Sequence, residues 1–379
     1  MKCKSSYVPA CLLSTVKRFV LKDWILLPGR YTVESQDLRC KFKMPIINTE
    51  LFTLPSSSKC GATQFSGLSM NGFSRWKPTK ENQDAVMVLF DTITDTLVVA
   101  CLDGHGEFGD KVAQFIRNKI QLLLVCHPCF ASDIKTAVLE TIETAEAMLL
   151  QRHYRECCFS GTTLSLAMIR DNKIITANIG DSRIVLSRNG VASALSTDHK
   201  ADLPEERERI IQAGGRVLTK VYEDGYIGPA RVYLPHTDSP GLAMSRSIGD
   251  YVIHEAGVTS TPEICEYDIV DEDGFMIVGT DGIWDFITNQ EVVDTASNYS
   301  SADAALNSIV RESVAKWTSK FDGVMDDTST IVVFFRGLTR CNDPFREGSE
   351  CDLELDSGAF TTKDGCTAYN VQSAGDIII

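Results

Sequence analysis

Short strand-like runs joined by two-residue turns fill residues 162–197 of this 379-residue chain. The runs are rich in Val and Ile, and the Asn189-Gly190 pair between two of them is typical of a tight hairpin. Parallel strands need a crossover of a dozen residues or more, so connections this short predict antiparallel neighbours. Runs of the same kind predict seven strands in all, namely Ala85–Phe90, Leu97–Leu102, Thr163–Ile169, Lys173–Ile179, Arg183–Ser187, Phe275–Gly279 and Thr330–Phe335.

Four longer segments carry the periodicity of amphipathic helices instead. In residues 110–125, for example, Val112, Ile116 and Ile120 recur at the spacing that places apolar side chains on one helix face. Antiparallel strands combined with long helices predict an α+β fold, in which an antiparallel β-sandwich is flanked by α-helices in a four-layer αββα arrangement. The predicted helices are 110–125, 133–152, Pro204–Ala213 and Ala302–Trp317.

Composition divides the chain into three predicted parts. Residues 1–59 form an irregular N-terminal extension, residues 60–338 form the folded domain, and residues 339–379 form an acidic, disordered tail. The formal net charge is −14, although residues 1–80 carry 13 Lys and Arg against 4 Asp and Glu, so the middle of the chain is strongly acidic. This balance argues against nucleic acid as a partner of the main domain.

Two further properties bear on where such a chain works. No run of about 18 apolar residues occurs, so we expect no membrane span. The 13 cysteines are scattered and odd in number, which is typical of a reducing compartment. We expect a cytoplasmic or nuclear protein, and a monomer.

Acidic side chains stand at the ends of four predicted strands. Asp84 and Asp103 bound the first two strands, and Asp281 and Asp326 lie beside the last two. A single Asp at the end of a strand is also typical of an ordinary turn. Four that meet at one edge would repel one another, and hard divalent cations such as Mg²⁺ or Mn²⁺ relieve that repulsion because they prefer oxygen ligands. The coincidence of four acidic strand ends therefore favours a metal site.

These residues lie in motifs that resemble those of the metal-dependent Ser/Thr protein phosphatases of type 2C. The resemblance covers about residues 60–336 and implies a β-sandwich flanked by helices. The matching motifs are, in order, KENQDA (80–85), LDGHGEFG (102–109), SGTT (160–163), ANIGDSR (177–183), TDHKADLPEERERIIQAGG (197–215), LAMSRSIGD (242–250), GTDGIWD (279–285) and DDTSTIVV (326–333).

The resemblance implies a set of oxygen ligands for two Mn²⁺ or Mg²⁺ ions. Asp84 and Asp103 would bridge the two ions, and the backbone carbonyl of Gly104 would complete one ligand shell. Asp281 and Asp326 would hold the second ion. The resemblance also implies a third, weakly bound ion, with Asp181 as its ligand and Asp281 shared with it.

The same resemblance implies the reaction. Phosphoserine and phosphothreonine in proteins would be hydrolysed, for signalling, by a water that the two ions activate, without a phosphoenzyme intermediate. His105 would be the general acid, because a histidine with a pKa of about 6.5 can protonate the leaving alkoxide near neutral pH. A polar turn histidine is the alternative for the same residue.

The sequence departs from the family pattern at two positions near Asp84. Thr79 stands where the family often has the Arg that grips the substrate phosphate, and Lys80 or Lys77 could replace it without the bidentate fork of a guanidinium. Gln83 stands where many members have Glu. The retained aspartates favour an active enzyme over the alternative, a pseudophosphatase that serves as a binding or scaffold module. Residues 216–255 are predicted to include a flap beside the active site.

Overall fold

The computed structural model describes residues 29–33, 44–75, 80–221, 227–239, 241–320 and 324–336. The chain divides into two units, Met1–Thr339 and Arg340–Ile379, and only the first contains described residues. The predicted acidic tail, Lys77 and Thr79 therefore lie outside the described residues.

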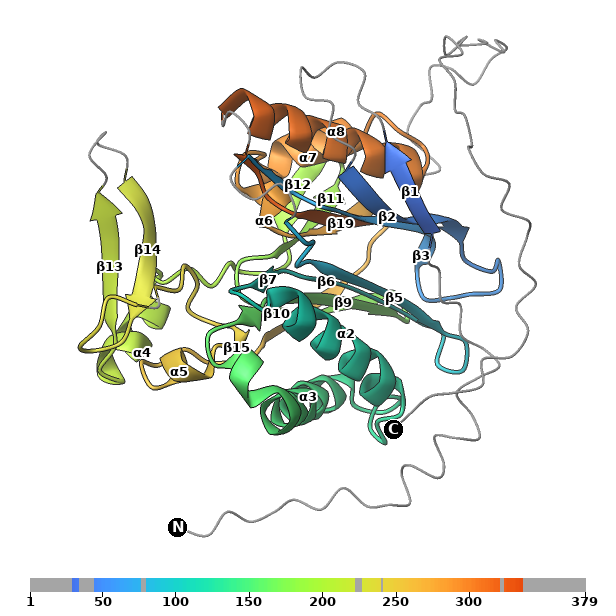
Figure 1. Cartoon of the computed structure of the whole chain (residues 1–379). Coiled ribbons are helices and arrows are strands. Elements are labelled where there is room, and N and C mark those ends of the chain that lie inside the picture. Colours follow the sequence, from blue (N-terminus) through green and yellow to red (C-terminus); the bar gives the residue numbers. More distant parts are fainter. Residues whose placement is uncertain are drawn as a thin grey trace, which may run out of the picture. The chain divides into compact units, whose positions relative to one another are not determined.

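A five-stranded antiparallel sheet forms one half of the core (Figure 1). Its strands pair in register with their neighbours, and Ala85 opposes Leu102 at one end of the sheet. The order from edge to edge is β16 (Glu263–Asp268), β10 (Lys173–Ile179), β9 (Leu164–Arg170), β6 (Thr96–Leu102) and β5 (Ala85–Asp91).

A seven-stranded antiparallel sheet forms the other half. Its first two strands lie within residues 1–59 and extend the sheet at one edge. This part of the chain is therefore not wholly irregular, although an irregular extension was predicted for it. The order is β1 (Gly29–Val33), β2 (Met44–Thr53), β3 (Ala62–Met70), β19 (Thr328–Phe335), β17 (Asp273–Gly279), β11 (Arg183–Arg188) and β12 (Val191–Ala194).

Both sheets are covered on both faces, and strand β6 accordingly has apolar side chains on both of its faces. Val98 and Ala100 belong to the cluster beneath helices α2 (Gly109–Val125) and α3 (Ile134–Cys157), whereas Leu97 and Val99 belong to the cluster between the sheets. A strand that is buried on both faces reads as a continuous apolar run. The predicted four-layer αββα fold is confirmed.

Three helices cover the outer face of the seven-stranded sheet: α6 (Asp281–Trp284), α7 (Asn289–Ala296) and α8 (Ala302–Lys320). Helix α7 begins at Thr288, whose hydroxyl and the Glu291 carboxylate form a reciprocal capping box. Among the helices of the described ranges, none has the length and apolar character that a membrane crossing requires.

The remaining elements are short. Strands β13 (Arg216–Val221) and β14 (Ile227–Tyr233) form a separate hairpin within the predicted flap, next to helix α4 (Pro204–Gln212). The others are β4 (Phe73–Ser74), β7 (Gly104–His105), β8 (Gly161–Thr162), β15 (Ile248–Gly249), β18 (Val324–Met325) and α5 (Tyr251–His254).

One predicted pairing is wrong. Strands β10 and β11, which only residues 180–182 separate, lie in different sheets rather than side by side. Gly180 has a φ of +93°, which an L side chain rarely adopts, and this turn sends the chain across the sandwich. A few extended residues can span the roughly 10 Å between stacked sheets, so a short connection does not require neighbouring strands.

Candidate metal centre

The predicted aspartates gather at one end of the sandwich. In the five-stranded sheet, Asp84 precedes β5 and Asp103 follows β6, and these two strand ends oppose each other in the register. In the other sheet, Asp281 follows β17 and Asp326 precedes β19, which are paired neighbours. Asp181 lies in the crossover between the sheets. Both sheets thus deliver carboxylates to the same edge.

The pKa values report how close these carboxylates are. Burial raises the pKa of Asp103 well above its ordinary value, and the charges of Asp281 and Asp84 raise it further. Burial likewise raises the pKa of Asp281, with a contribution from Asp326. The pKa of Asp84 rises to about 8, chiefly through burial, although Thr280 donates a hydrogen bond of 2.9 Å to its Oδ2. The cluster carries more negative charge than its surroundings neutralise.

The donor atoms fit hard divalent cations. The side chains that converge here are carboxylates. Oδ1 of Asp84 and Oδ1 of Asp181 are buried, and neither has a hydrogen-bond partner in the part of the chain that the structure describes. Oxygen donors of this kind suit Mg²⁺ or Mn²⁺ better than Zn²⁺. Within the described ranges, no three His, Cys, Asp or Glu side chains already stand as one ready-made metal site. The assignment of individual ligands therefore stays a prediction.

Two lysine side chains lie among these carboxylates. The Lys80 ammonium is 2.6 Å from Oδ1 of Asp326 and 3.2 Å from Oδ2 of Asp327, and the Lys200 ammonium pairs with Oδ2 of Asp181. Lys80, the predicted substitute for the phosphate-gripping Arg, therefore contacts a predicted metal ligand. No local sequence pattern predicts the pair of Lys80 with Asp326, because these residues lie 246 positions apart.

Gly104 holds two strand ends close together. Its N–H donates to the carbonyl of Gln83 at 3.1 Å, next to Asp84. A Cβ at this position would lie 2.4 Å from the carbonyl oxygens of both Gln83 and Gly109, far inside contact distance. Only glycine fits here.

We expect Gly104→Ala to destabilise the fold by about 2 kcal/mol or more, because two backbone carbonyls would have to move away from the new methyl group. Urea denaturation measures the change in the free energy of unfolding. Gly190→Ala is the control, since nothing lies within 4 Å of a Cβ there and only its φ of +74° is unfavourable. Equal losses in the two variants would contradict the crowding argument.

His105 is held by a partner that sequence reasoning missed. Its Nε2 lies 2.5 Å from Oδ2 of Asp250, which also accepts a hydrogen bond of 2.7 Å from Ser247 Oγ. Burial lowers the pKa of His105, but the Asp250 carboxylate outweighs this effect and raises the pKa above its ordinary value. Asp250 ends the quoted motif LAMSRSIGD, and its φ of +49° is one that non-glycine residues rarely adopt.

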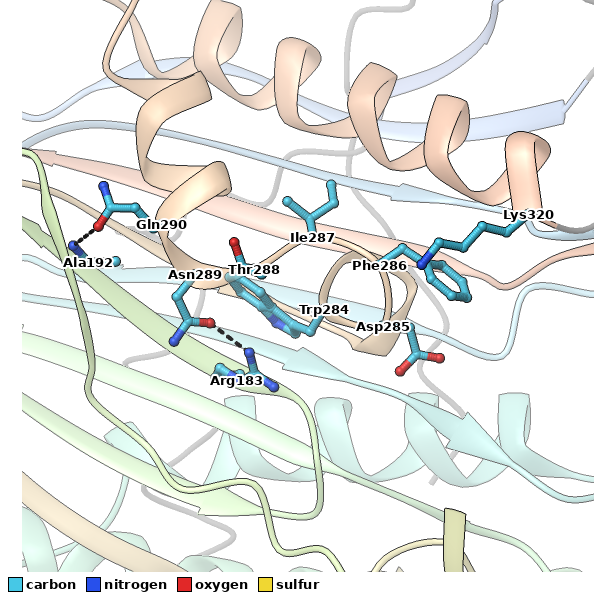
Figure 2. Close-up of a pocket in the computed structure, with 10 residues that line it drawn as sticks. All are labelled: Arg183, Ala192, Trp284, Asp285, Phe286, Ile287, Thr288, Asn289, Gln290 and Lys320. Carbon is cyan, nitrogen blue, oxygen red and sulfur yellow. Dashed lines mark hydrogen bonds between the residues drawn. The ribbon is translucent and has the colours of Figure 1, made fainter. Parts of the chain in front are cut away.

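A cavity of about 650 Å³ lies beside helices α6 and α7, and Figure 2 shows its lining. Arg183 stacks over the Trp284 ring at 5.2 Å and donates 2.6 Å hydrogen bonds to Asn289 and to Asp198. Asp285, one helical turn after the predicted ligand Asp281, stands at its edge. Removal from water raises the pKa of Asp285, and the charges of the nearby carboxylates add to the rise. The cavity thus adjoins the carboxylate cluster.

Much of the chain matches a known protein family. The family model described as protein phosphatase 2C matches residues 75–320. The chain is similar to the probable protein phosphatases 2C 34 and 2C 73 of Arabidopsis thaliana. The first is 36% identical over 74% of this chain and 84% of the relative, and the second is 35% identical over 69% and 78%.

Among solved structures, the chain is similar to a serine-threonine phosphatase 2C from Toxoplasma gondii. The TM-score is 0.63 at 19% identity, over 77% of this chain and 99% of the other, so this likeness concerns the fold. The sequence relatives, the family model and the shared fold agree, and the chain belongs to the protein phosphatase 2C family of protein serine/threonine phosphatases.

Proposed function

We propose that the chain hydrolyses phosphoserine and phosphothreonine in proteins with two Mn²⁺ or Mg²⁺ ions held by Asp84, Asp103, Gly104, Asp281 and Asp326. The observation that carries this proposal is the convergence of carboxylates from both sheets, whose burial and mutual repulsion raise their pKa values. When bound, such ions supply an activated water for in-line attack and neutralise phosphoryl oxygens. No phosphoenzyme intermediate is then required.

His105 has the chemistry to protonate the leaving serine or threonine oxygen. The Asp250 carboxylate stabilises the imidazolium and fixes the ring through a 2.5 Å contact, and Ser247 holds the same carboxylate oxygen. A raised pKa keeps more of His105 protonated at neutral pH. The proton passes from the imidazolium to the alkoxide as the P–O bond breaks.

Asp181 is the proposed ligand of a third, weaker ion. Its Oδ1 is buried and free of hydrogen bonds among the described residues, while its Oδ2 already pairs with the Lys200 ammonium. A carboxylate that is half neutralised by a lysine binds a further cation weakly. The pairing with Lys200 supports weak binding of the third ion at Asp181.

One assay tests the function as a whole. A phosphothreonine peptide is incubated with the purified chain and Mn²⁺, Mg²⁺ or EDTA, and released phosphate is measured. We expect hydrolysis with either ion and none in EDTA. A chain that binds Mn²⁺ but releases no phosphate from any phosphopeptide would favour the scaffold alternative.

We expect His105→Ala to slow hydrolysis of a phosphothreonine peptide by roughly 100-fold or more, in the range of general acid catalysis. Hydrolysis of p-nitrophenyl phosphate should fall much less, because its leaving group needs little protonation. The ratio of the two kcat values is the measurement. Equal losses on both substrates would remove the general-acid role of His105.

A further inference from the structure

The Lys80 side chain is positioned where it affects cation binding. Its ammonium contacts Oδ1 of Asp326, the same carboxylate that the proposed function assigns to a divalent cation. The Lys80 side chain is 22% exposed and that of Asp326 is 48% exposed, so water screens part of the attraction between them. An ammonium and a divalent cation on one carboxylate repel each other, and each weakens the binding of the other.

The surroundings allow the ammonium to leave without harm to the fold. Asp327, the second partner of Lys80, is buried, but its carboxylate also accepts backbone hydrogen bonds from Gly72 at 2.6 Å and from Gln83 at 2.9 Å. Asn71 Nδ2 donates to the Lys80 carbonyl at 3.2 Å and so fixes the backbone. The flexible four-carbon stem can therefore swing while the main chain stays in place.

We propose that Lys80 is a tethered competitor of the catalytic cation, and that its ammonium transfers from Asp326 to the substrate phosphate when the cation binds. This inference rests on the proposed function. It gives one residue two linked tasks: Lys80 lowers the affinity for the cation while the site is idle and grips the phosphate once the cation has displaced it. Thr79 carries no positive charge that could neutralise the phosphate.

The experiment compares the full chain with its Lys80→Met variant. Calorimetric titration with Mn²⁺ alone should give a dissociation constant about three- to ten-fold lower for the variant, since a partly exposed ion pair contributes modestly. Inorganic phosphate, as an inhibitor of p-nitrophenyl phosphate hydrolysis at saturating Mn²⁺, should bind the variant about three- to ten-fold more weakly. Lys80→Arg should restore phosphate inhibition.

Lys316→Met is the matched control, because it removes an ion pair of the same 2.6 Å length, to Glu291, on the outer helices. Both of its constants should equal those of the unmutated chain. An unchanged or higher Mn²⁺ dissociation constant for Lys80→Met would overturn the competition. Tighter Mn²⁺ binding with unchanged phosphate inhibition would overturn the transfer. If the unmutated chain bound no Mn²⁺, the proposed function itself would fail, which distinguishes the two failures.

Discussion

Asp281→Asn should abolish turnover while it stabilises the fold in the absence of divalent cations. The substitution removes one carboxyl group from a buried cluster in which the charge of Asp281 raises the pKa of Asp103, and the charge of Asp326 raises the pKa of Asp281. We expect kcat at saturating Mn²⁺ to fall by about 1000-fold or more, since bound cations supply several kcal/mol of transition-state stabilisation. In EDTA, the free energy of unfolding should rise by about 1 kcal/mol as repulsion falls.

The opposite end of the same strand offers a matched control. Asp273, the first residue of β17, is fully buried and pairs with Arg188, Oδ1 lying 2.7 Å from the guanidinium Nε. Asp273→Asn should therefore lower the free energy of unfolding by about 1–3 kcal/mol and leave Mn²⁺-dependent turnover in place. Substantial turnover in Asp281→Asn, or destabilisation equal to that of Asp273→Asn, would refute the metal role of Asp281.

Each of the seven predicted strands lies within two residues of its observed bounds, because its apolar run is continuous. Strand β10 matches its predicted bounds, and β6 differs from them only at Thr96. Strand β3 was not predicted, because its sequence ATQFSGLSM lacks the Val and Ile that are typical of strands. Small residues suit its place between the neighbouring strands β2 and β19, where six consecutive positions from Phe65 to Met70 are buried.

The acidic half of the site was readable from sequence, and its partners were not. Aspartates at strand ends are local signals, because the strand runs beside them mark where each lies. Ion pairs such as Lys80 with Asp326, and contacts such as His105 with Asp250, join residues 246 and 145 positions apart. No local pattern encodes such pairs, since they depend on how the two sheets stack. The crossover at Gly180 was misread for the same reason.

In EDTA, the free energy of unfolding should fall as the pH rises from 6.5 to 7.5. The pKa of Asp84 is about 8 in the folded chain and about 4 when unfolded, so in this interval the folded state holds a proton that the unfolded state has lost. Stability therefore falls with pH, by up to about 1.4 kcal/mol per pH unit for each such carboxyl. Asp103 and Asp281, whose pKa values are also raised, act in the same direction.

Between pH 6.5 and 7.5, His199, which has the opposite effect on stability, does not titrate. Burial lowers the pKa of His199 to about 4, so it adds a rise of stability with pH, but only below about pH 6.5. His105, with its raised pKa, shares the sign of the carboxylates. Urea denaturation of Asp84→Asn measures what this carboxyl contributes. In EDTA, the free energy of unfolding of this variant should fall less steeply with pH than that of the unmutated chain. Saturating Mn²⁺ should abolish most of the slope in the unmutated chain, since a carboxylate that binds a cation stays ionised. A slope that is flat in EDTA, or unaltered by Mn²⁺, would mean that these carboxylates neither share protons nor hold a cation.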